Sequence, residues 1–297
     1  MLVYIQYNLT DAATGGGNQF IKSVKKCLLA MGCITDNVED ADIILFNGHQ
    51  ESHSIQNLKN KYPNKKFIHR LDGLQKIYNQ PNDSRQDQAL AINKIADGTI
   101  FQSIWARNNF EKFGFDLSRK QTVIYNAPDK SIFYERFGEH NNTKIRLITT
   151  NWSSNMKKGF KYYQHLDKNL DFGKYEYRFI GNSPVDFINI KMFEPQTSLA
   201  LGYHLRNSDI FVSGVEHDAC SNSILEALGT GLPVVALNSG GTPELIGKGG
   251  ELFEGTDDVI DVIEKVSLNK EEYSENINID SIEQIAVNYL RFFEECL

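Results

Sequence analysis

The chain has 297 residues, 41% hydrophobic and 23% charged, a balance that excludes wholesale disorder and suits two α/β domains. Its 38 acidic and 31 basic residues give a net charge of -7, so nonspecific electrostatic binding to nucleic-acid phosphates is not expected. No apolar run approaches the roughly 18 residues of a membrane span. The start, 1–7, lacks a basic n-region, and the four cysteines are scattered, which together favour a cytoplasmic protein with reduced thiols.

The first half alternates short apolar runs with amphipathic stretches, which is typical of parallel βα units. A strand at 2–7 leads into a glycine-rich turn and a helix over 18–31, whose apolar residues recur at helical spacing. Near-continuous apolar runs such as Ile43–Phe46 suit strands covered on both faces of a sheet. The other elements predicted here are strands at 41–47, 66–69, 98–102 and 121–125 and helices at 83–96 and 104–113.

A polar segment over 135–143 predicts a linker, after which the alternation restarts. The predicted strands are 145–150, 175–180, 209–213, 233–237 and 250–253, and the predicted helices are 159–169, 199–206, 222–228, 257–266 and 281–295. We therefore divide the chain into Rossmann-like domains at 1–138 and 143–280. Two such halves on one linker predict a cleft at the carboxyl ends of their strands.

The segment 209–244 is the richest in candidate site residues. Ser221, Asn222 and Ser223 precede an apolar helical run, so they mark a helix N-terminus, which can hold a phosphate through free N–H groups. Glu226, one turn into that helix, can accept hydrogen bonds from a ribose diol. Asp218, in the loop before the helix, can reach a sugar hydroxyl.

This segment resembles the donor-binding region of GT-B glycosyltransferases of family 4, the glycosyl transferases group 1. The resemblance rests on Asp218 and Glu226, with seven residues between them, and on the later runs Gly231-Leu-Pro-Val-Val235 and Gly240-Gly-Thr-Pro-Glu244. It implies that the first acid contacts the transferred sugar and the second the nucleotide ribose. Asp218 stands where the family usually has glutamate. The alternative is that both acids only cap and solvate a surface helix.

A second motif, Lys157-Lys158-Gly159, ends the loop after the first strand of the second half. A lysine on a strand-to-helix turn can neutralise a diphosphate leaving group, and the resembled family has a Lys-Gly pair here. The arginine that the family often carries upstream is absent, so neutralisation is assigned to the two lysines and the helix end. Two solvated loop lysines are the alternative. Gly181, after the strand 175–180, is included among the donor-binding candidates.

Two further motifs follow strands of the first half. Gly16 and Gly17 resemble the glycine loop that lies near phosphates and acceptor in GT-B enzymes; a plain tight turn is the alternative. His69 ends the strand 66–69, and Arg70 and Asp72 follow it in a polar turn. Many family members place a histidine beside the acceptor after the corresponding strand, and His69 matches it, with Asp72 and Arg70 as alternatives. A structural Arg70–Asp72 pair is the competing interpretation.

The resemblance implies a GT-B fold, with two Rossmann-like domains facing across a cleft and the last helix, 281–297, crossing back to the first domain. It also implies a hexosyltransferase-type reaction (class EC 2.4) that retains configuration, from a nucleotide-diphospho-sugar to a hydroxyl of a glycan or lipid-linked acceptor. The catalytic candidates are His69, Asp72, Lys158 and Asp218. The scheme requires no metal and no cofactor, because protein groups neutralise the leaving group.

Two alternatives stay open at this point. One is a non-hydrolysing nucleotide-sugar epimerase on the same fold, which would interconvert sugars without an acceptor. The other is a catalytically silent nucleotide-sugar-binding protein, which the missing arginine and the aspartate at 218 favour. Peripheral membrane contact occurs in such enzymes, but the acidic balance of this chain gives it no support.

Overall fold

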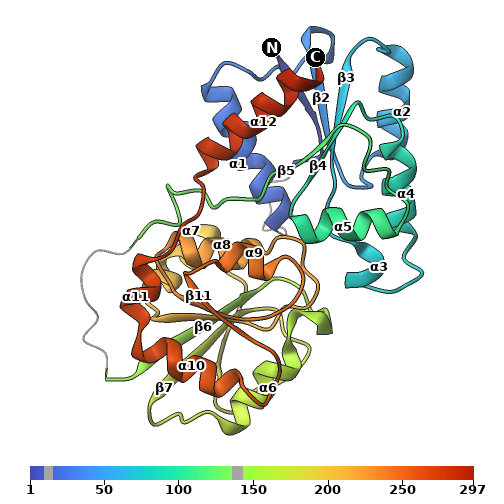
Figure 1. The fold of residues 1–297 in the computed structure, drawn as a ribbon. Helices are drawn as coiled ribbons and strands as arrows, with labels where there is room; N and C mark the ends of the chain where they lie inside the picture. The colour runs from blue at the N-terminus through green and yellow to red at the C-terminus, as the bar shows by residue number, and fades with distance from the viewer. Residues whose placement is uncertain (10–15, 136–142) are drawn as a thin grey trace. The chain divides into compact units, whose positions relative to one another are not determined.

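The computed structural model describes residues 1–9, 16–135 and 143–297, and it separates into two compact units (Figure 1). Unit 1 comprises Met1–Asp11, Gly17–Asn126 and Asp280–Leu297, and unit 2 comprises Ala12–Gly16 and Ala127–Ile279. The last helix therefore belongs to the same unit as the first strand. Each unit is built on its own parallel sheet.

The sheet of unit 1 contains five named strands in the order β1-β2-β3-β4-β5, all parallel. Their bounds are Val3–Gln6, Ile43–Asn47, Lys66–Arg70, Gly98–Phe101 and Gln121–Val123. An isolated bridge between Val3 and Ile34 adds one more chain segment outside β1. The segment around Ile34 therefore lies on one side of β1 and β2 lies on the other, so the order of the segments in the sheet reverses at β1. In open parallel sheets ligands bind at such a reversal, outside the carboxyl ends of the strands.

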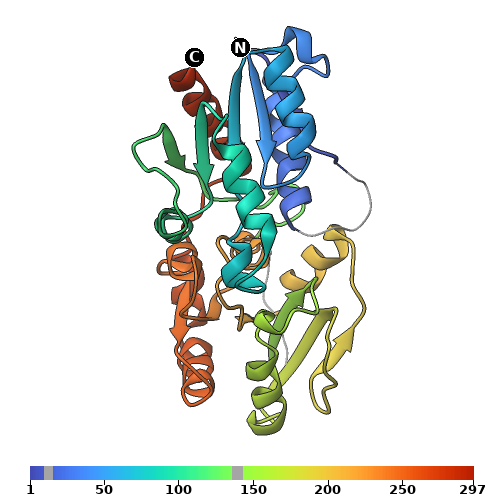
Figure 2. The same cartoon turned by 90° about the vertical axis from the view of Figure 1, so that its right-hand side faces the viewer.

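Helices cover both faces of this sheet. On one face α1 (Gly16–Ala30) meets α12 (Ile282–Cys296), with the rings of Phe20 and Tyr289 6.4 Å apart. Figure 2 looks onto the other face, where α2 (Ser52–Lys61) and α4 (Ser84–Asn93) bury an apolar cluster that includes Phe46. The remaining short elements of unit 1 are η1 (Val38–Asp40), α3 (Gln75–Tyr78) and α5 (Ile104–Lys112).

The sheet of unit 2 has six parallel strands in the order β11-β10-β9-β6-β7-β8. In chain order, β6 to β11 span Ile145–Asn151, Tyr175–Gly181, Lys191–Phe193, Ile210–Ser213, Val234–Leu237 and Gly250–Phe253. Counted within the unit, this is the strand order 3-2-1-4-5-6 of dinucleotide-binding sheets. The order reverses between β6 and β9, which are adjacent, so this unit too has a point where a ligand is expected.

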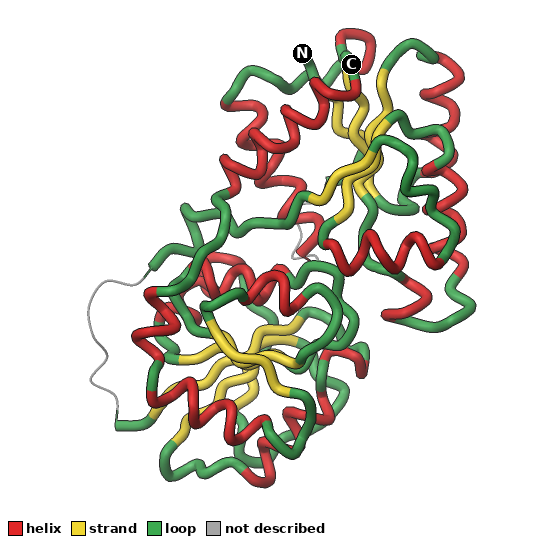
Figure 3. The backbone as a smooth tube through the Cα atoms, viewed as in Figure 1, coloured by secondary structure: helices red, strands yellow, loops and turns green. Residues whose placement is uncertain are grey.

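Helices also lie on both sides of the second sheet (Figure 3). Side chains from α6 (Phe160–Asn169) and α10 (Val259–Leu268) form a continuous core with one sheet face, in which Phe179 packs against the rings of Phe160 and Tyr163. On the other face lie α7 (Ser198–Arg206), α8 (Asn222–Gly229) and α9 (Thr242–Ile246). The two remaining elements are η2 (Met156–Lys158) and α11 (Lys270–Glu275).

The α/β class with two parallel sheets is confirmed. The division between units falls after Asn126, earlier than the polar segment 135–143, because the chain beyond it packs within unit 2. There Arg206 donates a 2.7 Å hydrogen bond to the carbonyl of Ile132, and its guanidinium lies 3.9 Å from the ring centre of Tyr134. Residues 136–142 of the predicted linker lie outside the described residues.

Candidate functional site

The candidate residues of unit 2 follow the two strands that flank the reversal. The loop after β6 ends in Lys157, Lys158 and Gly159, and the loop after β9 contains Asp218. An added Cβ at Gly159 would lie 2.5 Å from backbone atoms of Gly214, so glycine is needed where the two loops touch. Glu216 also donates its N–H to the Lys157 carbonyl at 2.7 Å. The loop after β6 and the loop after β9 are therefore fixed against each other.

Lys158 and Asp218 meet across these loops. The Lys158 Nζ lies 3.2 Å from Asp218 Oδ2, and the two side chains are 23% and 20% exposed. The other carboxylate oxygen, Oδ1, accepts the N–H of Cys220 at 3.2 Å. The structure thus brings together a cation and an acid that the sequence assigned to different parts of a donor. Both retain exposed surface through which they can reach a ligand.

The Gly-Gly-Thr-Pro-Glu loop after β10 contacts the backbone of Asp218 and of its neighbour His217. Gly241 donates its N–H to the Asp218 carbonyl at 2.9 Å, and His217 donates its N–H to Ser239 Oγ at 3.0 Å. An added Cβ at Gly240 would lie 2.3 Å from the Asp218 carbonyl oxygen. The glycine motif and the acid therefore form one unit, in which the glycines position the loop that carries Asp218.

Helix α8 begins beside this loop. Ser221 is its N-cap residue but makes no side-chain cap hydrogen bond, since its hydroxyl pairs with that of Ser223 at 3.0 Å. The amino end of a helix carries a partial positive charge, which favours an anion there. Asn222 and Ser223 are partly exposed there.

Glu226 lies one turn into α8 and is partly exposed. Within the described residues its carboxyl group has no hydrogen bond and no ion pair, and burial raises its pKa to about 8. A desolvated acid that lacks a protein partner is typical of a functional site. A ligand diol would supply the missing hydrogen bonds.

Gly181, the last residue of β7, also lies at this edge of the sheet. It pairs with Asn151, and the next residue, Asn182, donates its N–H to the Asn151 carbonyl at 3.1 Å. The Asn151 side chain in turn donates to the carbonyls of Ser153 and Asn182. Gly181 thus borders the loop that leads to Lys158.

The candidates of unit 1 divide into a buried residue, His69, and a partly exposed one, Asp72. His69 lies within β3 and is fully buried, with its ring stacked 4.3 Å from that of Phe46. Its Nε2 lies 2.7 Å from the Gly48 carbonyl, and its Nδ1 lies 3.0 Å from Asn93 Nδ2. Both contacts fit one neutral tautomer, in which Nε2 donates and Nδ1 accepts. Burial lowers the pKa of His69 to about 3, so it is neutral at physiological pH.

Asp72 is the partly exposed member of a polar network that includes Arg70. Arg70, fully buried, donates to Asp72 at 2.8 Å, to Asn47 at 2.6 Å and to Asn126 at 2.7 Å. Asp72 also accepts from Asn47 at 2.6 Å and from Gln102 at 3.2 Å, and its side chain is 24% exposed. The structural Arg70–Asp72 pair is therefore present, and Asp72 keeps surface for a ligand.

Sequence reasoning missed the polar residues that follow β1 and β2 at the reversal in unit 1. Tyr7 follows β1. Its pKa is raised mainly by burial and secondly by the negative charge of Asp72, so its hydroxyl stays a neutral donor. His49 follows β2. Its pKa is lowered mainly by burial and secondly by the positive charge of Arg85. The available signal was Asn47-Gly48-His49 directly after the buried strand 43–47. Gly16 and Gly17 form the start of α1 after β1, whereas Thr14 and Gly15 lie outside the described residues.

Comparison with known proteins identifies the domain. Residues 189–268, which span Asp218, Glu226 and the glycine loop, match the family model described as Glycosyl transferases group 1. The chain contains a glycosyl transferases group 1 domain. The matched residues lie within unit 2. No curated protein sequence matches the chain.

The fold is that of GT-B glycosyltransferases. Sucrose-phosphate synthase from Thermosynechococcus elongatus superposes with a TM-score of 0.78 at 12% identity, over 99% of this chain and 98% of that one. HepE from Anabaena, solved with UDP, gives 0.73 at 12% identity, over 99% of both chains. A TarM mutant from S. aureus gives 0.67 at 16% identity, over 91% of this chain and 58% of that one. At sequence identities this low, the structural similarity establishes a shared fold and nothing further.

Neither a metal centre nor a membrane span emerges from the described part of the chain. No group of three or more His, Cys, Asp or Glu residues in 1–9, 16–135 and 143–297 is arranged to hold a metal ion. Over the same ranges, no helix combines the length and the apolar character needed to cross a bilayer.

Proposed function

We propose that this glycosyltransferase transfers a sugar from a nucleotide-diphospho-sugar to a hydroxyl group, with retention of configuration. The observation that carries the proposal is the grouping of Lys158, Asp218 and Glu226 at the β6/β9 reversal of a sheet with dinucleotide-binding order. Lys158 and the amino end of α8 would neutralise the diphosphate, Glu226 would bind the ribose and Asp218 the sugar. Lys157 adds positive charge beside them.

We infer that the nucleotide is uridine diphosphate. HepE has been solved with UDP and with UDP-glucose, and the TarM mutant with UDP, which supports this choice for a chain of the same fold. In the proposed step the bond from C1 to the diphosphate oxygen breaks and a bond from C1 to the acceptor oxygen forms. The acceptor proton leaves with the departing diphosphate. Lys158 offsets the charge that develops on that group.

We propose that unit 1 binds the acceptor, a glycan or lipid-linked sugar, through Asp72. Its exposed carboxylate can accept a hydrogen bond from an acceptor hydroxyl, while Arg70 and Asn47 hold it in place. His69 then acts as a positioning residue, because it contacts the Gly48 carbonyl beside Asp72 from a fully buried position. Gly16 and Gly17 remain proposed contacts for donor phosphates.

A thermal-shift screen of UDP-, GDP-, ADP- and CMP-sugars tests the donor, since a ligand that binds the folded state raises the melting temperature. We expect stabilisation by a UDP-sugar, reduced in Glu226→Ala and Lys158→Ala variants. Calorimetry should give the same order of affinities. Unchanged affinity in both variants would overturn the site assignment.

Transfer is tested by NMR of the product formed from that donor and a panel of sugar acceptors. Retention requires that the new bond has the anomeric configuration of the donor. Conversion of the donor sugar without any acceptor would instead indicate an epimerase. Donor binding without turnover across the panel would indicate a silent binding protein.

A further inference from the structure

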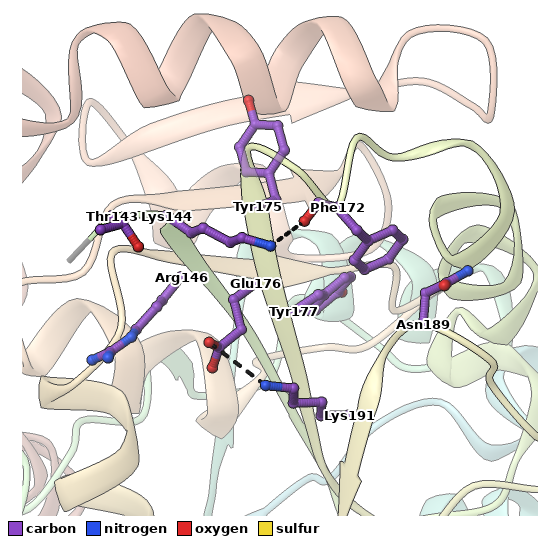
Figure 4. Close-up of a pocket in the computed structure, with 9 residues that line it drawn as sticks. All are labelled: Thr143, Lys144, Arg146, Phe172, Tyr175, Glu176, Tyr177, Asn189 and Lys191. Atoms are coloured by element: carbon purple, nitrogen blue, oxygen red, sulfur yellow. Dashed lines mark hydrogen bonds and ion pairs between the residues drawn. The ribbon is translucent and has the colours of Figure 1, made fainter.

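A pocket lies in unit 2, away from the donor candidates. Its volume is about 430 Å³, and Figure 4 shows its lining of Thr143, Lys144, Arg146, Phe172, Tyr175, Glu176, Tyr177, Asn189 and Lys191. These residues gather at the amino ends of β6, β7 and β8, whereas Lys158 and Asp218 follow the carboxyl ends of strands. The seven residues of β6 separate the two ends by about 20 Å.

The lining carries an excess of positive charge. Three of the nine residues are cations, namely Lys144, Arg146 and Lys191, and one is an acid, Glu176. The strand register places Arg146, Glu176 and Lys191 on one side of three adjacent strands. The excess is local, because the chain as a whole has a net charge of -7.

Glu176 does not cancel this excess, because Arg178 already engages it. The Arg178 Nε and Nη2 both lie 2.6 Å from Glu176 Oε1, whereas Lys191 Nζ is 3.7 Å from Oε2. Burial acts to raise the pKa of Glu176, but the hydrogen bond from Arg178 and the charges of Arg178, Lys191 and Arg146 hold it below its ordinary value. Within residues 1–9, 16–135 and 143–297, the hydrogen bonds of the Arg146 and Lys144 side chains go to backbone carbonyls, of Asn207 and Phe172 respectively.

One wall of the pocket is held by a buried acid. Asp167, 4% exposed, accepts the N–H groups of Ile188, Asn189 and Ile190 at 2.8 to 2.9 Å. The Asn189 side chain donates to the Asp167 carbonyl at 2.8 Å. The loop that carries Asn189 is thus fixed before any ligand arrives, which reduces the ordering cost of binding.

We propose that this pocket binds a small phosphomonoester of about the size of a hexose phosphate. Arginine and lysine are the usual protein ligands of a phosphate group. The Asn189 amide and the Thr143 hydroxyl suit a polar organic body, and the volume exceeds what inorganic phosphate fills. The site is separate from the donor site and does not depend on the proposed reaction.

The test is calorimetry at low salt with glucose 6-phosphate, inorganic phosphate and glucose as probes. We expect glucose 6-phosphate to bind more tightly than phosphate, and glucose not to bind. An Arg146→Gln/Lys191→Gln variant should bind glucose 6-phosphate about tenfold more weakly or worse, the loss of one charge-assisted hydrogen bond. Lys130→Gln/Lys248→Gln, which removes two exposed cations elsewhere in unit 2, is the matched control and should bind normally.

Two additional variants make the result decisive. Lys191→Gln alone alters a side chain that is 62% exposed, so it should fold even if the double variant does not. Lys158→Gln/Glu226→Gln disables the donor site and should leave glucose 6-phosphate binding unchanged. Equal binding by glucose or by inorganic phosphate, no binding at millimolar concentration, or binding that follows Lys158 rather than Lys191 would each overturn the proposal.

Discussion

Gly240 stands against the backbone of Asp218, so close that a Cβ at position 240 would lie 2.3 Å from the Asp218 carbonyl oxygen and 2.8 Å from its nitrogen. Its φ of +64° also favours glycine. The acid is therefore positioned by a loop that begins more than twenty residues later in the chain. The position of Asp218 therefore depends on the glycine loop. Lys158 depends in turn on Asp218, which is its ion-pair partner.

Replacing this glycine should disturb the donor site more than it disturbs folding. Gly240→Ala forces the two loops apart, and we expect donor affinity to fall about tenfold or more. Gly247→Ala is the control, because Gly247 also has a positive φ, +52°, but no atom lies within 4 Å of an added Cβ. Backbone strain from the positive φ should cost both variants about 1 kcal/mol or more of stability, and Gly240→Ala should lose more because its Cβ meets the Asp218 backbone. Equal donor affinity in both would contradict the role of Gly240.

The residues of the acid and lysine motifs could be proposed from sequence because the spacing within each motif is local. Lys158 and Asp218 lie in loops after β6 and β9, which begin with the residues Ile-Arg-Leu-Ile and Ile-Phe-Val. His69 was harder to place, since a strand pattern does not reveal which side chain at its end is covered. Its cover comes from Asn93 on α4, which lies 24 residues away in sequence.

Elements without a strong apolar pattern were not predicted. In α2 only Ile55 is buried, and the rest of the helix is mostly lysine, asparagine and other polar residues, so the helical period is weak. Strand β8 has the sequence Lys-Met-Phe at the sheet edge, where the first two residues are exposed. Its pairing with β7 is a tertiary contact that composition does not signal.

Glu226 should make the protein less stable as the pH rises from 4.5 to 8. Its pKa in the folded state is about 8, above its ordinary value of 4.5, so the folded state holds the proton more tightly. That contribution is complete below pH 4.5 and is lost as pH rises through 8. A Glu226→Gln variant should therefore gain melting temperature relative to the parent between pH 5 and 8, while it loses donor affinity. Glu275→Gln, at an exposed position in unit 2, should show no such trend.

Asp218 and Glu226 should differ in which part of the donor they affect. If Asp218 contacts the sugar, Asp218→Asn weakens binding of the UDP-sugar but not of UDP, and it also releases Lys158 for the diphosphate. Glu226→Gln should weaken both ligands, because both contain the ribose. Calorimetric titrations with UDP and UDP-sugar measure the difference. Glu216→Gln, which breaks the neighbouring 2.7 Å pair with Lys161, serves as control, and a loss of UDP affinity in Asp218→Asn would refute the division.

His69 should make unit 1 sensitive to acid. Because its pKa of about 3 in the folded state lies below the ordinary 6.5, its contribution to stability is present above pH 6.5 and is lost as pH falls toward 3. The loss is about 1.4 kcal/mol for each pH unit over that window. His69→Gln, which keeps a donor for the Gly48 carbonyl, should unfold with a shallower dependence on pH below 6.5. His53→Gln, at an exposed position on α2, should follow the parent, and an unchanged slope in His69→Gln would contradict the buried neutral ring.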